Sequence, residues 1–231
     1  RFRTSDPSWA PCVVDGEVYA PSAAPLARER FVLTVAWLQA DNARRKGIPE
    51  VIRAAALLRD RIPGVRFVIV GDRGSGYPAL RALTEELGLG EVVEFRGLVS
   101  REEKVALMQR CGVYLQPSRF EGFGVAVLEA MSCGAPVVVS AGGALPEVVG
   151  DDGVVLADPT PPAIADAVGR AGGMIFMPPM DIFDAGRMAV FADTTGAPFS
   201  VWQPNEHIGA ELVNEPGTFT WTELCTRHTE V

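Results

Sequence analysis

The chain has 231 residues, 48% hydrophobic and 22% charged, which is the balance of an ordinary globular protein with one large domain or two small ones. Its formal net charge of -8 argues against a general nucleic-acid-binding or anionic-membrane surface. The four cysteines form no C-x-x-C pair, and no apolar run reaches the roughly 18 residues of a membrane-spanning helix. We therefore expect a cytoplasmic protein without a bound metal, and the absence of an initial Met suggests a fragment.

Residues 1–29 contain four prolines and predict an irregular leading segment or linker. From residue 30 onward, short apolar runs typical of buried strands alternate with segments of helical periodicity. The predicted strands are 30–38, 65–72, 92–97, 112–118, 136–140 and 153–156. The predicted helices are 48–62, 77–88, 100–111 and 124–132, with a short one beginning near Leu145.

Local signals mark the ends of several of these helices. Pro49 falls in the first turn of the helix at 48–62, where a missing N–H costs nothing. Gly88 is a candidate C-cap, and Ser100 with Glu103 three residues later fits a capping box. Continuous apolar strands separated by helices indicate a parallel sheet covered on both faces, so the predicted fold is doubly wound α/β. Such sheets bind ligands beyond the C-terminal ends of their strands.

The character of the chain changes near Ala171. Residues 172–231 contain eight acidic residues and two arginines, a net charge of -6, which leaves -2 for residues 1–171. Helix-strand alternation also gives way to "RMAVFADTTGAPFSVWQP", two strand-like runs around a turn. We therefore place a domain junction at about 171, between an α/β domain at 30–171 and a small, mainly β segment at 172–231.

The stretch "RFEGFGVAVLEAMSCG" carries two carboxylates, Glu121 and Glu129, around a glycine turn that leads into a helix. Gly122 and Gly124 let the backbone approach a ligand, and the helix adds the positive end of its dipole, so the turn is a candidate anion seat. Helical geometry brings position 129 to about 80° from the direction of position 121, close enough to line one cleft. Carboxylates accept hydrogen bonds from hydroxyl groups, so a ligand with central phosphates and a polyol at each end would fit.

These residues carry a resemblance to a known family. "PSRFEGFGVAVLEAMSCGAPVVVSAGGALPEVV" resembles the donor-site signature of retaining GT-B glycosyltransferases with an E-x7-E motif. The resemblance covers about residues 12–170 and includes "RRKGIPEVIRAAALL", "FVIVGD" and "VVEFRGLVS" in the family's order. It implies a Rossmann-like domain that binds a nucleoside diphosphate sugar and uses no further cofactor.

The resemblance also implies roles for individual residues. Glu121 would face the hydroxyls of the transferred sugar, and Lys46 would neutralise the diphosphate leaving group, so these two are the candidate catalytic residues. Glu129 would face the ribose hydroxyls. The other expected donor contacts are Arg45 at the diphosphate, the turn of Gly122, Phe123 and Gly124, the base contacts Arg96 and Gly97, and the sugar loop of Gly142 and Gly143. For Arg96, simple pairing with a neighbouring acid is an equal alternative.

Two departures from the family pattern bear on function. The family often has Gly-Arg after its first strand, with the Arg on phosphate, whereas this chain has Ala36-Trp37, and Arg44 or Arg45 is the candidate substitute. Family members also hold the acceptor in an N-terminal Rossmann-like domain that has no counterpart in this chain. We therefore expect the fragment to bind donor better than it turns donor over.

The segment at about 172–226 resembles the vicinal oxygen chelate superfamily, the glyoxalase and bleomycin-resistance type, whose modules are βαβββ. Only the later strands of one module and the first strand of the next are expected. His207, Glu211 and His228 are available as metal ligands, but their spacing does not define a site. A sheet cut in this way leaves unpaired edges, which favour self-association.

Three functions therefore compete. The first is the donor half of a retaining glycosyltransferase that acts on an unknown acceptor. The second is an enzyme of the same architecture, such as a nucleotide-sugar epimerase. The third is a non-catalytic module in which the α/β half holds nucleotide and the β segment mediates dimerisation. Neither the base nor the sugar can be inferred from the residues.

Overall fold

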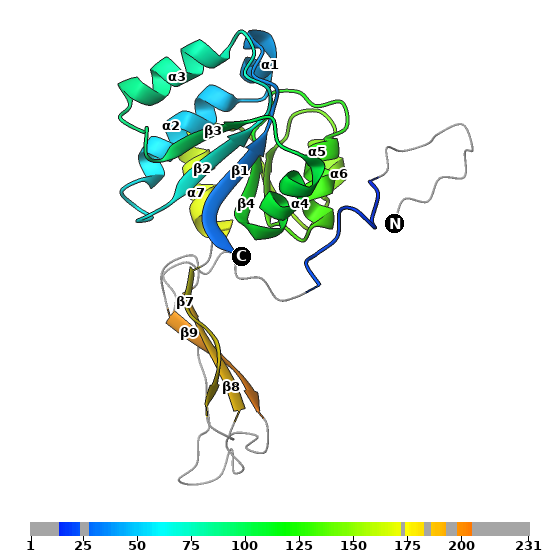
Figure 1. Ribbon diagram of the computed structural model, residues 1–231, viewed down its shortest axis with the longest axis vertical. Helices are drawn as coiled ribbons and strands as arrows, with labels where there is room; N and C mark the ends of the chain where they lie inside the picture. The colour runs from blue at the N-terminus through cyan, green and yellow to red at the C-terminus, as the bar shows by residue number, and fades with distance from the viewer. Residues whose placement is uncertain (1–13, 24–27, 172–173, 183–185, 193–197, 205–231) are drawn as a thin grey trace, which may run out of the picture. The chain divides into compact units, whose positions relative to one another are not determined.

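The computed structural model describes residues 14–23, 28–171, 174–182, 186–192 and 198–204, with side chains up to Ala171. The chain divides into two compact units, Arg1–Ala171 and Gly172–Val231. Figure 1 shows the first unit as a sheet with helices on both sides. Within the described ranges, no helix has the length and apolar character needed to cross a membrane.

The first unit contains a six-stranded sheet in which every pair of neighbouring strands is parallel. The strands are β1 (Glu29–Val35), β2 (Arg66–Val70), β3 (Val93–Gly97), β4 (Cys111–Gln116), β5 (Val137–Ser140) and β6 (Val154–Leu156). Their order is β3-β2-β1-β4-β5-β6, so the chain first builds outward from β1 to β3 and then crosses to the other side of β1. The point where the order reverses lies between β1 and β4, where doubly wound sheets bind ligands. The predicted α/β fold is confirmed.

Seven helices connect or follow these strands in the described part of the first unit. They are α1 (Ala40–Arg45), α2 (Ile48–Leu58), α3 (Tyr77–Glu86), α4 (Arg101–Arg110), α5 (Val125–Ser132), α6 (Leu145–Val149) and α7 (Pro161–Ala171). The sequence did not predict α1 or α7. Of the six residues of α1 only Ala43 is buried, so the segment has no apolar periodicity to detect.

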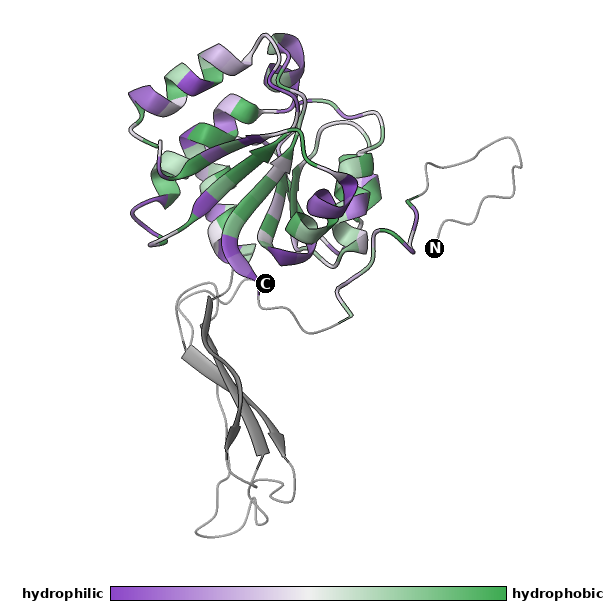
Figure 2. Ribbon diagram, in the orientation of Figure 1, coloured by the Kyte–Doolittle hydropathy of each residue, from purple (hydrophilic) through white to green (hydrophobic). Residues whose placement is uncertain are grey.

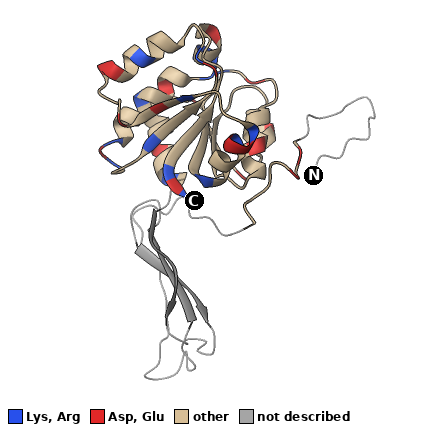
Figure 3. Ribbon diagram, viewed as in Figure 1, with Lys and Arg blue, Asp and Glu red and all other residues tan. Residues whose placement is uncertain are grey.

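Two apolar cores lie on opposite faces of the sheet. Alternate side chains of a strand point to opposite faces, so Val113 and Leu115 belong to the core shared with α2 and α7, whereas Tyr114 belongs to the core shared with α4, α5 and α6. Figure 2 shows mainly hydrophobic central strands, with the hydrophilic residues on the outer parts of the helices. In Figure 3 the charged residues accordingly lie on the helices and near the strand ends. Polar groups on the sheet itself are therefore exceptions that need an explanation.

The predicted helix signals are present where they can be checked. The Ser100 hydroxyl accepts a hydrogen bond from the Glu103 amide at 3.1 Å at the start of α4. Gly88 adopts a left-handed φ of +64° just after Leu87, the C-cap of α3, and Pro49 lies in the first turn of α2. These positions confirm the predicted starts of α2 and α4, whereas α2 ends at Leu58 and α3 at Glu86, before the predicted ends at 62 and 88.

Part of the leading segment packs on the α/β domain. Tyr19 is buried in the core beside α4 and α5, with Val14 and Val18 next to it. Arg28 donates to the backbone carbonyls of Cys111, at 3.0 Å, and of Gly134. The described part of this segment therefore packs on the domain beside α4 and α5.

The second unit contains a three-stranded antiparallel sheet in the order β7-β8-β9. The strands are β7 (Met174–Ile182), β8 (Gly186–Ala192) and β9 (Pro198–Pro204). The two strand-like runs predicted around a turn correspond to β8 and β9. His207, Glu211 and His228 lie outside the described residues, and self-association of this segment stays a prediction.

Gly47 sets the position of the α1-α2 turn against the end of β4. It has a left-handed φ of +70°, and a Cβ atom there would lie 2.5 Å from the Pro117 carbonyl oxygen. We predict that Gly47→Ala lowers the free energy of unfolding by about 1–3 kcal/mol, because both the backbone conformation and the close approach become unfavourable. The exposed Gly90, with nothing within 4 Å of an added Cβ, provides the control Gly90→Ala. Equal losses for the two variants in denaturant titrations would contradict this role for Gly47.

Candidate functional site

Lys46 and Glu121 meet at the reversal point of the sheet, although 75 residues separate them in the sequence. Lys46 follows α1 in the connection after β1, and Glu121 lies in the loop after β4. The Lys46 Nζ lies 2.6 Å from the Glu121 Oε2, and the two side chains are only 13% and 14% exposed. The structure therefore brings the two predicted catalytic residues into direct contact.

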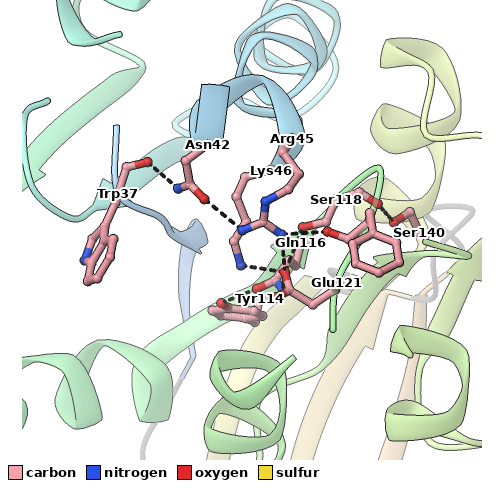
Figure 4. A network of polar contacts seen from close by, with 10 residues as sticks. Trp37, Asn42, Arg45, Lys46, Tyr114, Gln116, Ser118, Glu121 and Ser140 are labelled. Carbon is pink, nitrogen blue, oxygen red and sulfur yellow. Dashed lines mark hydrogen bonds and ion pairs between the residues drawn. The ribbon is translucent and has the colours of Figure 1, made fainter. Parts of the chain in front are cut away.

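Other donors converge on the same carboxylate oxygen (Figure 4). The Gln116 amide nitrogen lies 3.0 Å from Glu121 Oε2, and the Ser118 hydroxyl lies 3.4 Å from it. The Arg45 guanidinium contacts this oxygen at 3.5 Å and donates to the Phe120 carbonyl at 2.6 Å. Glu121 is thus held by two cations and two neutral donors.

Of the two arginines proposed as substitutes for the family's Gly-Arg, only Arg45 joins this network. Arg44 pairs instead with the exposed Asp41 at 2.6 Å. Trp37 is 69% exposed, and its carbonyl accepts a hydrogen bond from the Asn42 side chain at 2.6 Å. Its indole points away from Glu121 in Figure 4. Trp37 therefore supplies a backbone carbonyl to Asn42, which contacts Arg45, and it brings no cation to this site.

A buried tyrosine, Tyr114, contacts the side chain of Gln116. The Tyr114 hydroxyl donates to Gln116 Oε1 at 3.0 Å, and both side chains are buried on β4. Burial raises the pKa of Tyr114 well above its ordinary value, and the negative charges of Glu129 and Glu121 add to the shift. The sequence reasoning missed both residues. The available signal was a glutamine two positions after a tyrosine in a predicted buried strand, which places both on one face.

The glycine turn leads into α5 as predicted. Gly124 has a left-handed φ of +94° and immediately precedes Val125, the first residue of the helix. In the described part of the chain, the amides of Phe123 and Gly124 donate to no protein acceptor. An added Cβ at Gly122 would meet nothing within 4 Å, so the turn is open on that side. These features suit an anion, because amides without a protein acceptor and the positive end of the helix dipole both favour negative charge at a helix N-terminus.

The loop after β5 closes on the same turn. The Ala144 amide donates to the Glu121 carbonyl at 3.0 Å. Gly143 has a left-handed φ of +71°, and side chains at Gly142 and Gly143 would collide with the backbone of Ser118 and Glu121, respectively. Gly142 and Gly143 therefore lie against the backbone of the loop that carries Glu121.

Glu129 belongs to a separate ion pair. The Lys104 ammonium of α4 lies 2.8 and 2.9 Å from the two carboxylate oxygens of Glu129, and it also lies 5.0 Å from the centre of the Tyr19 ring. Burial alone lowers the pKa of Lys104, but hydrogen bonding to Glu129 and Tyr19 outweighs burial and raises the pKa above its ordinary value. The sequence reasoning did not single out Lys104 or Tyr19, because only the tertiary structure joins them to α5.

Arg96 pairs with neighbouring acids, the simpler of the two interpretations that its sequence context allows. Its guanidinium contacts Glu103 at 2.9 Å and Glu94 at 3.4 Å at the surface. Gly97 is the last residue of β3 and has a left-handed φ of +79°. Both lie at the carboxyl edge of the sheet, at the end of the outer strand β3.

A cavity of about 530 Å³ opens beside this network, between α2 and the ends of β4, β5 and β6. Glu50, Ser118, Arg119, Gly142 and Asp158 contribute to its lining. Glu50 pairs with Arg119 at 3.2 Å, and its Oε2 is buried without a hydrogen-bond partner among the described residues. The cavity therefore has a mixed polar and apolar lining, and one buried carboxylate oxygen of Glu50 lies in its wall.

The family model described as "Glycosyl transferases group 1" matches residues 27–171. The match covers more than half of the chain and contains both carboxylates of the candidate site. The chain belongs to the glycosyl transferases group 1 family.

Similar proteins fall into two sets. The first set consists of glycosyltransferases. It includes the D-inositol 3-phosphate glycosyltransferase of Mycobacteroides abscessus, which is 35% identical over 168 residues, 68% of this chain and 37% of that relative. Among solved structures, Alr3699/HepE of Anabaena in complex with UDP and glucose has 25% identity and a TM-score of 0.58, and the match covers 67% of this chain and 44% of that chain. The second set includes CFP32 of Mycobacterium bovis, named as a glyoxylase, with 55% identity over 64 residues, 28% of this chain and 24% of that relative. The chain thus spans well under half of the curated relatives described here.

In this group 1 domain the Lys104–Glu129 pair is largely buried, with side-chain exposures of 23% and 11%. We predict that Lys104→Met lowers the free energy of unfolding by about 1–3 kcal/mol, because it leaves a buried carboxylate without its cation. The double variant Lys104→Met with Glu129→Gln should recover part of this loss. Arg81→Met, which breaks the exposed pair with Glu85 at 2.8 Å, is the control and should cost at most about 0.5 kcal/mol. Equal effects of the two single variants in urea unfolding would contradict the prediction.

Proposed function

We propose that residues 27–171 bind a nucleoside diphosphate sugar and form the donor half of a retaining glycosyltransferase of the E-x7-E type. The observation that carries the proposal is the contact of Lys46 and Arg45 with Glu121 beside the free amides of Phe123 and Gly124. Cations, free amides and a carboxylate acceptor meet at the reversal point of the sheet. This combination suits a ligand that joins a diphosphate to a sugar.

The proposed chemistry places charge where these residues can stabilise it. When the bond between the sugar and the diphosphate breaks, negative charge develops on the diphosphate. Lys46, Arg45 and the N-terminus of α5 then stabilise the leaving group without reorganising solvent. Glu121 accepts hydrogen bonds from sugar hydroxyls, and no further cofactor takes part.

The remaining residues of the proposed site contact the ribose, the base and the sugar of the nucleoside diphosphate sugar. Glu129, held by Lys104, accepts the ribose hydroxyls, and the end of β3 at Arg96 and Gly97 faces the base. Gly142 and Gly143 bring the loop after β5 over the sugar. The UDP and glucose named with Alr3699/HepE support a uridine nucleotide as the first ligand to test.

The chain matches only part of each relative, and this matters for how the acceptor is bound. Because this chain spans 37% of the D-inositol 3-phosphate glycosyltransferase and 44% of Alr3699/HepE, we propose that acceptor binding requires a further domain outside these residues. For residues 172–231 we infer a partial glyoxalase-like module. The similarity to CFP32 and the three antiparallel strands support that assignment.

Calorimetry on the full chain with UDP-, GDP- and ADP-glucose, and with the free diphosphates, tests the proposal. Glu129→Ala should weaken the nucleoside diphosphate and its sugar alike, by about 1.5–3 kcal/mol, because the lost hydrogen bonds to ribose are charge-assisted. Glu121→Ala should weaken only the nucleotide sugar, because its partner is the sugar. Glu50→Ala, which removes a carboxylate from the neighbouring cavity, is the control. Absence of binding by all ligands, or equal losses for both ligands in Glu121→Ala, would contradict the proposed site.

Lys46→Ala tests the phosphate contact separately. We expect UDP to lose about tenfold or more in affinity while uridine changes less than about twofold, because only the diphosphate places charge beside the ammonium. The defect should shrink as salt is added, because the lost interaction is electrostatic. If uridine and UDP lost affinity together in a folded variant, Lys46 would support the fold and not the ligand.

A further inference from the structure

Tyr114 and Gln116 form a buried polar chain that ends on Glu121. Both side chains lie on the same face of β4, and they are 0% and 1% exposed. The Tyr114 hydroxyl donates to Gln116 Oε1 at 3.0 Å, and Gln116 Nε2 donates to Glu121 Oε2 at 3.0 Å. Buried polar groups on an otherwise apolar sheet face are costly unless they are paired. Each donor and acceptor of these two side chains therefore needs a hydrogen-bond partner.

The chemistry of the three groups fixes the direction of the chain. An ionised carboxylate only accepts hydrogen bonds, so the amide of Gln116 has to present its nitrogen to Glu121. The amide oxygen then faces Tyr114, which has to donate. Burial raises the pKa of Tyr114 well above its ordinary value, so its hydroxyl keeps the hydrogen that this arrangement needs. Tyr114 thereby stabilises one of the two orientations of the Gln116 amide.

The two carboxylate oxygens of Glu121 therefore receive different numbers of donors. Oε2 receives Lys46, Gln116, Ser118 and Arg45. Among the residues that the structure describes, no donor reaches Oε1. The buried side of the carboxylate is therefore occupied by protein, and one oxygen is left to accept a hydrogen bond from a ligand.

We propose that Gln116, oriented by Tyr114, is a positioning residue that sets the rotation of the Glu121 carboxylate and so selects donor sugars that offer a hydroxyl hydrogen to Oε1. The inference rests on the proposed function and adds a specificity element to it. Lys46 also donates to Oε2, but its ammonium is a compact charge on a flexible stem, whereas the planar amide of Gln116 is held in one orientation by Tyr114 and so gives its hydrogen bond a defined direction. A sugar with an acceptor-only group at the matching position would be bound less well.

The experiment measures UDP and UDP-glucose affinity on the full chain. Gln116→Met keeps a side chain of similar length without the amide, and it should weaken UDP-glucose by about tenfold while UDP changes less than about twofold. Tyr114→Phe should produce a smaller loss in the same direction. The double variant should bind UDP-glucose no worse than Gln116→Met, because Tyr114 acts only through Gln116. Thr34→Val is the matched control, because it removes another buried hydroxyl, which donates to the Leu115 carbonyl at 2.9 Å.

The possible failures are distinguishable. If Gln116→Met and Tyr114→Phe are folded by thermal melting and keep UDP-glucose affinity while Glu121→Ala loses it, the positioning role is wrong and the proposed function stands. Additive losses in the double variant, or an equal sugar-selective loss in Thr34→Val, would likewise overturn it. If neither UDP nor UDP-glucose binds the unsubstituted chain, the proposed function itself fails. Tyr114→Phe removes a single oxygen, so it provides the test if Gln116→Met does not fold.

Discussion

The ion pair between Lys46 and Glu121 joins the connections that follow β1 and β4, the two strands on either side of the reversal in strand order. Its geometry depends on close backbone packing, because Gly47 lies against Pro117 and Gly143 lies against Glu121. Any side chain at these glycines would separate the segments that carry the charges. The close backbone contacts therefore determine how near the charged groups lie to each other.

The carboxylates of Glu121 and Glu129 are held in different ways. Glu121 is surrounded by donors from the turn after α1 and from β4, whereas Glu129 is held by Lys104 on α4 with Tyr19 beside it. Both charges contribute to the raised pKa of the Tyr114 hydroxyl, after burial itself. The buried polar groups of β4 thus connect electrostatically to both ends of the proposed donor site.

Two findings limit what can be inferred about function: the family to which the chain belongs, and the part of its relatives that it matches. Membership of the glycosyl transferases group 1 family rests on residues 27–171, which hold the whole set of proposed donor contacts. The similarity to CFP32 concerns 64 residues and a different kind of protein. Donor binding can therefore be proposed from the residues of this chain, whereas the complete transfer reaction is a proposal that reaches beyond the part of the relatives that the match covers.

The sequence by itself determined the α/β fold of residues 30–171, because continuous apolar strands, helix caps such as Ser100 and helical periodicity are local signals. It also predicted Lys46 and Glu121, through glycine spacing and family resemblance. It did not single out Tyr114 and Gln116, although both lie in one predicted strand, because no local signal shows that Glu121 in the following loop turns back onto Gln116. It could not supply Lys104 and Tyr19 as partners of Glu129, because these contacts join separate elements. Nor could it supply Glu103 as an ion-pair partner of Arg96, since the position of Glu103 depends on how β3 meets α4. The physical reason is that periodicity and caps act within one element, whereas the partners of a charged side chain are set by the packing of several.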